Sequence, residues 1–194
     1  MIYFDNSATT RPYKEVVDLV AKLSYEEFGN PASLHSFGMR AERILEQSRK
    51  QLADTLKADP EEIVFTSGGT EAVNLAIKGS AEALKRSGKH VLSTPIEHPA
   101  ALESLKVLEN MGYEVEMLSV DDKGMIDTGE LKKKLRKDTI LVNIMMVNNE
   151  TGVIQPVTEA GHIIKSSNPN TVFHVDAVQA YGKLPIDTRS LRAD

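Results

Sequence analysis

The sequence predicts an α/β fold, a three-layer arrangement in which a wound, mainly parallel sheet carries helices on both faces. Two observations predict it. Strand-length apolar runs alternate with helix-length segments from residue 63 to residue 175, which is the pattern of successive βαβ units. In addition, residues 139–147 are apolar almost without interruption, as is typical of parallel strands that are buried on both sides.

The composition describes a globular protein and excludes several classes of function. Of the 194 residues, 41% are hydrophobic and 26% are charged. The net charge is −5 and there is no basic stretch, so nucleic-acid binding is not expected. No apolar run approaches the roughly 20 residues that cross a bilayer, and the N-terminus does not resemble a signal peptide. Cysteine is absent, which excludes disulfides and thiolate metal sites within the chain and favours a cytoplasmic location.

Two helices and a short strand are predicted in the first third of the chain. The first helix spans residues 13–27, where apolar residues recur at helical spacing. It is ended by Gly29 and by Pro31, which disfavours a helical residue before it. The second helix spans residues 36–57. Residues 63–65 are β-branched or aromatic and predict a short buried strand.

The remainder of the chain alternates regularly between the two kinds of element. The further predicted strands are residues 90–94, 114–120, 139–147 and 171–175, and the further predicted helices are residues 97–111, 127–137 and 156–166. Turn residues separate them, as in the Asp-Asp-Lys-Gly sequence at 121–124. Such an order predicts strands that all point the same way, with their carboxyl ends at one edge of the sheet.

The turn Ser67-Gly68-Gly69 joins the first predicted strand to a helix that opens at Thr70. The first N–H groups of a helix are unpaired, and the helix dipole is positive there, so a phosphate would be bound over Gly69 and Thr70. The pattern is equally that of an ordinary capped turn. It is neither a P-loop nor a Rossmann dinucleotide fingerprint, so a phosphate bound here belongs to some other ligand.

Polar residues follow three of the later strands, residues 90–94, 139–147 and 171–175, at the edge where sheets of this kind bind their ligands. They are Glu97, His98, Asn148, Asn149, Glu150, Asp176 and Gln179. Together with the phosphate turn they predict a cofactor pocket. Taken singly, each has a plainer interpretation, such as a surface histidine, turn asparagines, a capping aspartate or a solvated glutamine. The histidines show no metal-ligand spacing, so no metal site is expected.

Six motifs, in order, resemble the cysteine desulfurases, which are class V aminotransferase-like enzymes of fold type I that use pyridoxal 5′-phosphate (PLP). They are YFDNSATT at 3–10, GNPASLH at 29–35, FTSGGTE at 65–71 with NLA at 74–76, TPIEH at 94–98, VNNETG at 147–152 and HVDAVQ at 174–179. The resemblance extends over essentially the whole chain. It implies the large domain of a PLP-dependent transferase.

The resemblance also implies how PLP is held. Gly69 and Thr70 match the family's phosphate-binding turn. Asp176 matches the carboxylate that pairs with the pyridine nitrogen, where an anion keeps that nitrogen protonated and makes the ring a better electron sink. Gln179 matches the amide at the phenolic oxygen of the ring.

Other matched positions imply catalytic and substrate-binding roles. His98 matches the catalytic histidine, which stacks on the ring of the cofactor and can move protons. Asn149 matches the asparagine near both the cofactor and the carboxylate of the substrate. Asn30 is expected at the substrate, and residues 1–12 are expected to form an N-terminal active-site segment.

The activity implied is conversion of L-cysteine to L-alanine, with the sulfur held as an enzyme persulfide for Fe–S cluster, thio-cofactor or tRNA biosynthesis. A sulfur-acceptor protein, a homodimer and a cytoplasmic location go with it. Residues 13–194 then form an incomplete, truncated PLP-binding large domain. The family's Schiff-base lysine, nucleophilic cysteine and C-terminal small domain have no counterpart here, so turnover by this chain alone is not expected.

Two other interpretations stay open at this point. One is a non-catalytic, truncated module that binds PLP or a partner. The other is a different class V enzyme, such as a selenocysteine lyase.

Overall fold

The structure is a computed structural model that describes residues 2–194. The described residues form two compact units, one ending at Val64 and the other spanning Phe65–Asp194. The assignment of residues 1–12 to an active-site segment and of residues 13–194 to one incomplete domain stays a prediction.

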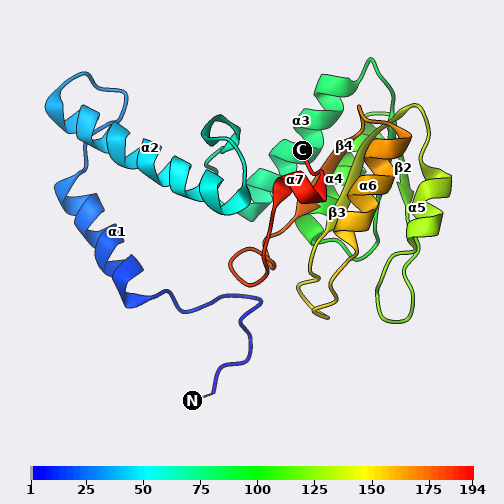
Figure 1. Cartoon of the computed structure of the whole chain (residues 1–194), viewed down its shortest axis with the longest axis horizontal. Helices are drawn as coiled ribbons and strands as arrows, with labels where there is room; N and C mark the ends of the chain where they lie inside the picture. The colour runs from blue at the N-terminus through cyan, green and yellow to red at the C-terminus, as the bar shows by residue number, and fades with distance from the viewer. Residues whose placement is uncertain (1) are drawn as a thin grey trace. The chain divides into compact units, whose positions relative to one another are not determined.

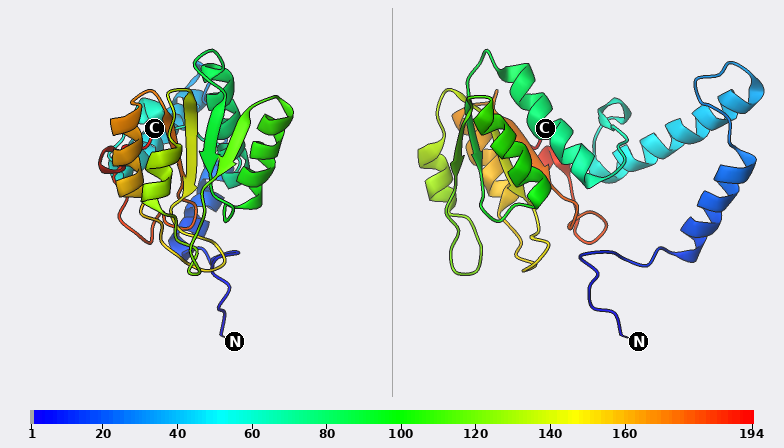
Figure 2. Two further views of the ribbon diagram at one scale, coloured as in Figure 1. Left: turned by 90° about the vertical axis from the view of Figure 1, so that its right-hand side faces the viewer. Right: turned by 180° about the vertical axis from the view of Figure 1, so that it is seen from behind.

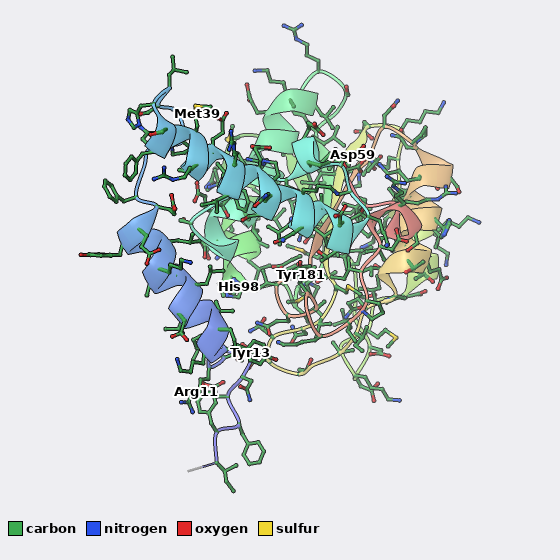
Figure 3. All side chains as sticks on the ribbon, turned by 60° about the vertical axis from the view of Figure 1, so that its left-hand side comes forward. Arg11, Tyr13, Met39, Asp59, His98 and Tyr181 are labelled. Carbon is green, nitrogen blue, oxygen red and sulfur yellow. The ribbon has the colours of Figure 1, made fainter. Side chains whose placement is uncertain are left out.

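The first unit is helical. It contains α1 (Lys14–Glu26), α2 (Ser36–Leu56) and the short 3-10 helix η1 (Pro60–Glu62), so both predicted helices are confirmed. The ring of His35 begins α2 by accepting a hydrogen bond from the backbone N–H of Gly38 at 3.3 Å. The helix ends where Lys57 adopts a left-handed conformation. Figure 3 labels Tyr13, just before α1, and Met39, near the start of α2.

Residues 63–65 form no strand, so this prediction is wrong. Val64 is 67% exposed and Phe65 is 46% exposed, which also contradicts the expected burial. A strand needs a neighbour to hydrogen-bond, and the described sheet has four strands, none of which pairs with this segment. The β-branched and aromatic composition alone is therefore not enough to order it as a strand.

The second unit is built on a four-stranded sheet. Its strands are β1 (His90–Ser93), β2 (Glu114–Met117), β3 (Thr139–Met145) and β4 (Val172–Asp176), in the order β2-β1-β3-β4. All three pairings are parallel. Every residue of β3 is buried, as its continuous apolar sequence predicts. The predicted wound parallel sheet is confirmed.

Helices cover both faces of this sheet (Figures 1 and 2). The helices are α3 (Gly69–Leu84), α4 (Pro99–Asn110), α5 (Thr128–Lys134), α6 (Val157–Ser167) and α7 (Thr188–Leu191). The buried side chains of α3 and α4 form one apolar cluster with the sheet, and those of α5, α6 and α7 form another. The core therefore has two layers, one on each face, which gives the expected three-layer arrangement.

The helix that was not predicted, α7, is short and begins at a local signal. The Asp187 carboxylate caps it by accepting hydrogen bonds from the N–H groups of Arg189 and Ser190. It is held by burial of Leu191 in the apolar cluster formed with α6. Its four residues carry too little periodicity to be recognised in the sequence.

The connections reverse direction in the middle of the sheet. From β1 the chain passes through α4 to β2 on one side, and from β3 it passes through α6 to β4 on the other. Since α4 and α6 lie on opposite faces, the carboxyl ends of β1 and β3 leave a crevice between them. Ligands of open parallel sheets bind at such a switch point.

One glycine in α6 is expected to be intolerant of any side chain. A Cβ at Gly161 would lie 1.9 Å from the backbone carbonyl oxygen of Leu191, so α6 and α7 would have to separate. We expect Gly161→Ala to lower the free energy of unfolding by about 1–3 kcal/mol. The control is Gly79→Ala in α3, where a Cβ would meet nothing within 4 Å and alanine is the better helix former. Chemical denaturation of both variants measures this, and equal stabilities would contradict the packing described.

Candidate functional site

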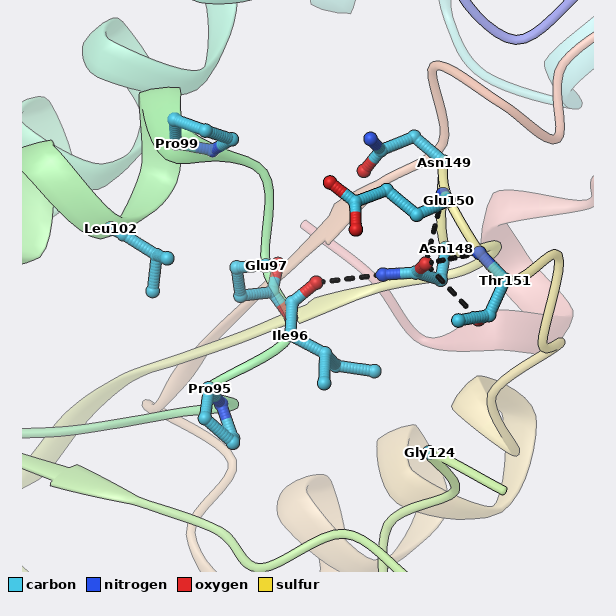
Figure 4. A pocket seen from close by; sticks show the side chains of 10 residues that line it. All are labelled: Pro95, Ile96, Glu97, Pro99, Leu102, Gly124, Asn148, Asn149, Glu150 and Thr151. Atoms are coloured by element: carbon cyan, nitrogen blue, oxygen red, sulfur yellow. Dashed lines mark hydrogen bonds between the residues drawn. The ribbon is translucent and has the colours of Figure 1, made fainter. Parts of the chain in front are cut away.

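A cavity of about 350 Å³ lies at the switch point, between the loop after β1 and the loop after β3 (Figure 4). Its lining residues are Pro95, Ile96, Glu97, Pro99, Leu102, Gly124, Asn148, Asn149, Glu150 and Thr151. Most of them come from the two loops that the sequence places at the carboxyl ends of these strands. The predicted convergence of the loops after β1 and β3 is therefore present.

The side chain of Asn148 holds these two loops together. Its Nδ2 donates to the carbonyl oxygen of Ile96 at 2.8 Å, and its Oδ1 accepts from the N–H groups of Glu150 and Thr151 at 2.9 and 2.8 Å (Figure 4). Asn148 is only 7% exposed, so its amide serves the loop and not a ligand. The next residue, Asn149, is half-buried and lines the cavity. Its predicted role in binding the cofactor and the substrate stays a prediction.

A second connection between the same walls is made by Glu97, which is 4% exposed. Its Oε1 accepts hydrogen bonds from Thr94 Oγ1 at 2.7 Å and from the backbone N–H of Met145 at 2.9 Å. Its Oε2 has no hydrogen-bond partner within residues 2–194. Burial raises the pKa of the Glu97 carboxyl to about 7, and the negative charge of Asp176 adds to the effect.

His98 follows directly and begins α4. Its Nδ1 accepts a hydrogen bond from the backbone N–H of Ala100 at 3.1 Å, so in the neutral ring the proton is carried on Nε2. The side chain is exposed. The imidazole is thus oriented by the helix start and presents an N–H to its surroundings, which is what a ring that donates or relays a proton requires.

Asp176 is the last residue of β4 and is 8% exposed. Its Oδ1 accepts from the N–H of Val178 at 3.0 Å, and among the described residues its carboxylate takes part in no ion pair. In the sheet it lies opposite Met145, the residue whose N–H Glu97 accepts. A buried, unneutralised carboxylate at the rim is suited to a cationic group of a ligand.

The predicted phosphate turn lies against the loop that follows Asp176. A Cβ on Gly69 would come within 3.1 Å of Cγ2 of Val178. The helix α3 begins at Gly69, and its N-cap residue is Gly68, so no N-cap side chain accepts a hydrogen bond from its first turn. The carboxylate of Glu71 instead accepts from Ser67, through Oγ at 2.6 Å and the backbone N–H at 2.7 Å, and the hydroxyl contact lowers the Glu71 pKa. The exposed start of this 16-residue helix can accept an anion.

Two predicted site residues have less definite surroundings. Gln179 is half-buried just after Asp176, and its Oε1 accepts from Lys183 Nζ at 3.3 Å. Asn30 belongs to the first unit, where its side-chain Oδ1 accepts from the N–H of Ala32 at 2.9 Å. Its predicted role at the substrate stays a prediction.

Glu97 and Asn148 belong to the rim residues that the sequence predicts, but the sequence assigns neither of them a role of its own. Both directly precede residues with an assigned role, and both act on backbone groups of the opposite loop. Their position immediately after a strand was the sequence signal that placed them at the rim. Their burial could not be predicted, because it depends on how the two loops pack against each other.

Over residues 2–194 there is no grouping of three or more histidine or acidic side chains suited to a metal. Nor does any helix in that range have the length and apolar character needed to cross a membrane.

Similar curated relatives include several that are named cysteine desulfurase. The chain is 46% identical over 194 residues to "Cysteine desulfurase IscS" of Neisseria meningitidis serogroup C (strain 053442), covering 100% of this chain and 48% of the relative. It is 47% identical over 193 residues to "Cysteine desulfurase IscS" of Methanosarcina thermophila, covering 100% of this chain and 47% of the relative. The chain thus spans about half the length of the curated relatives it matches.

Solved structures give the same result. A "NIFS-LIKE PROTEIN" superposes with a TM-score of 0.96 at 41% identity, covering 100% of this chain and 53% of that one. A structure described as "SspA in complex with cysteine" superposes with a TM-score of 0.93 at 35% identity, covering 99% of this chain and 55% of that one. The resemblance drawn from the six motifs is confirmed. The aminotransferase class-V family model matches residues 2–194, and the chain belongs to the class V aminotransferase family.

Proposed function

We propose that this chain forms the PLP-binding part of a cysteine desulfurase, an enzyme that converts L-cysteine to L-alanine and retains the sulfur as a persulfide. The observation that carries the proposal is the approach of Gly69, at the open start of α3, to Val178 in the loop directly after the buried carboxylate of Asp176. An anion-binding helix start and a buried anion on one rim suit a ligand with a phosphate at one end and a protonated ring nitrogen at the other.

The residues of the chain fit such a ligand in distinct ways. The N–H groups of Gly69 and Thr70 and the Thr70 hydroxyl would hold the phosphate. Asp176 would keep a proton on the pyridine nitrogen, and Gln179 would donate its amide to the phenolic oxygen. When bound, PLP supplies an electron sink for the bonds at Cα of the substrate.

Substrate handling would involve His98 and Asn149. The Nε2–H of His98 is available to donate or relay a proton, because Nδ1 is already engaged with the backbone of α4. Asn149 lines the switch-point cavity and would bind the carboxylate of L-cysteine. The cysteine complex of the SspA structure supports this choice of substrate class.

The thiolate that attacks the substrate sulfur keeps that sulfur as a persulfide when the C–S bond of the substrate breaks. This thiol must lie outside these 194 residues, because the chain contains no cysteine. A homodimer, a sulfur-acceptor protein and a cytoplasmic location are proposed on the strength of the desulfurase relatives.

The proposal is tested by titrating the chain with PLP and with pyridoxal, which lacks the phosphate, using isothermal calorimetry. We expect PLP to bind about tenfold to a hundredfold more tightly, because the difference is a set of charge-assisted hydrogen bonds. Thr70→Val should weaken the binding of PLP and leave that of pyridoxal unchanged. Thr128→Val, at the start of α5, is the matched control and should change neither. Equal affinity for both ligands, or no saturable binding of PLP, would refute the proposed site.

A further inference from the structure

The side chain of Glu97 accepts a hydrogen bond from a backbone N–H of β3 that has no acceptor on β1. In the ladder between β1 and β3, Leu92 lies opposite Val142, and β1 ends one residue later at Ser93. The N–H of Met145 therefore has no strand carbonyl to pair with on that side, since the neighbouring N–H of Met146 already points to β4 and donates to Asp176. Glu97 Oε1 supplies the missing acceptor at 2.9 Å. A side chain of the loop after β1 thus completes the edge of β3.

Only one of the two carboxyl oxygens of Glu97 is satisfied. Oε1 accepts from Thr94 and from Met145, whereas Oε2 is buried and has no partner within the described part of the chain. A buried carboxylate oxygen without a donor or a cation is costly, whereas a protonated oxygen is neutral and becomes a donor itself. The geometry therefore favours the carboxylic acid, with its proton on Oε2.

The charged and titratable groups around Glu97 favour the same form. Asp176 on β4 is the nearby carboxylate, and its charge opposes a second anion. Desolvation lowers the pKa of the half-buried His174 on β4, which disfavours a positive charge beside Glu97, and its Nδ1 contacts Asn143 Oδ1 at 2.6 Å. Glu150 lines the same cavity from the loop after β3, and His98 is the next residue along the loop. The hydrogen bonds from Thr94 and Met145 stabilise the anion partly, but burial outweighs them.

We propose that Glu97 is a positioning residue of the cofactor site, which as a neutral carboxylic acid fastens the loop carrying His98 to the last residue of β3. Its role at the cofactor rests on the proposed function. Its contact with Met145 and its protonation are properties of the chain without any ligand. Together with the Asn148 contact to Ile96, it fixes the loop at two consecutive residues immediately before His98.

Two substitutions separate the hydrogen bond from the charge. Glu97→Gln keeps an oxygen that accepts from Thr94 and Met145, and it replaces the O–H by an amide donor, so it reproduces the neutral acid. Glu97→Ala leaves both donors unpaired. We expect amide hydrogen exchange at Met145 to accelerate by about tenfold or more in Glu97→Ala and to stay within about threefold of the parent in Glu97→Gln. Exchange that is equally fast in both variants, or unchanged in Glu97→Ala, would overturn the proposal.

The charge state is tested directly by carbon-13 NMR of the Glu97 carboxyl, with the exposed Glu103 of α4 as the reference signal. We expect a midpoint about 7, and a lower midpoint in Asp176→Asn, which removes the neighbouring charge. Since the folded chain then binds more protons than the unfolded chain between about pH 4.5 and 7, the stability of the parent relative to Glu97→Gln should fall across that range as pH rises. A Glu97 carboxyl with a midpoint at its ordinary value of 4.5 would show an anion and overturn the proposal.

These measurements need no cofactor, which separates the two proposals. If PLP fails to bind the parent chain, the proposed function fails, and the exchange and titration data still decide the role of Glu97 in holding the loop. If PLP binds, Glu97→Ala should weaken its binding and Glu97→Gln should restore it. Equal PLP affinity of Glu97→Ala and the parent would overturn the positioning role.

Discussion

Replacing Asp176 by asparagine is expected to weaken PLP binding by about 30-fold or more. The carboxylate is 8% exposed and is the proposed partner of the ring nitrogen. Loss of one member of a buried, hydrogen-bonded charge pair costs at least about 2 kcal/mol, which corresponds to this factor. The fold should be retained, because asparagine Oδ1 can still accept from the N–H of Val178. Calorimetric titration with PLP measures the effect.

The control is Asp187→Asn. Asp187 is also an aspartate whose Oδ1 accepts backbone N–H groups, but it caps α7 and is not part of the proposed site. We expect it to leave PLP affinity unchanged. Nitrogen-15 NMR of ring-labelled PLP gives a second reading, with a protonated ring nitrogen in the parent and a deprotonated one in Asp176→Asn. An unchanged protonation state in Asp176→Asn would show that another group holds the proton.

Replacing Phe173 by alanine is expected to lower the free energy of unfolding of the Phe65–Asp194 unit by about 3–5 kcal/mol. Phe173 lies on β4 and is one of the largest fully buried side chains of the apolar cluster beneath α6 and α7. Its removal leaves a cavity that the packed helices cannot fill by themselves. Because β4 also presents Asp176, PLP affinity should fall with stability. Chemical denaturation followed by circular dichroism measures the first effect.

Phe4→Ala is the matched control for Phe173→Ala. Phe4 is 91% exposed, so its removal should change stability by no more than about 0.5 kcal/mol. A Phe173→Ala variant that is as stable as Phe4→Ala would contradict the packing of the sheet against its second helical layer.

The sheet and most helices could be predicted from the sequence because their signals are local and repeated. Continuous apolar runs such as β3 can form little else in an alternating α/β chain. Residues 63–65 show the limit of such signals. Their β-branched and aromatic composition favours a strand, as the composition of β3 does. A strand also requires a neighbouring strand to hydrogen-bond, and the residues of the segment do not show whether such a neighbour exists.

The sequence predicted which loops form the candidate site, but not the contacts that hold these loops together. Strand order and the carboxyl-edge rule indicated which loops would meet, and the loops after β1 and β3 do line one cavity. The roles of Glu97 and Asn148 were not predictable. Each depends on a backbone group more than 45 residues away, the N–H of Met145 and the carbonyl of Ile96, so the relevant contact exists only after the sheet has formed. For His98, the sequence could not show which ring nitrogen is hydrogen-bonded. The structure shows that Nδ1 accepts from the N–H of Ala100.

Binding of PLP at the carboxyl rim of this sheet is tested most directly by amide chemical-shift mapping during a PLP titration. We expect the largest shifts on Gly69, Thr70 and Val178 and on the loop around His98. Shifts that are confined to other helix starts, such as that of α5, or that are scattered without a focus at the rim, would contradict it.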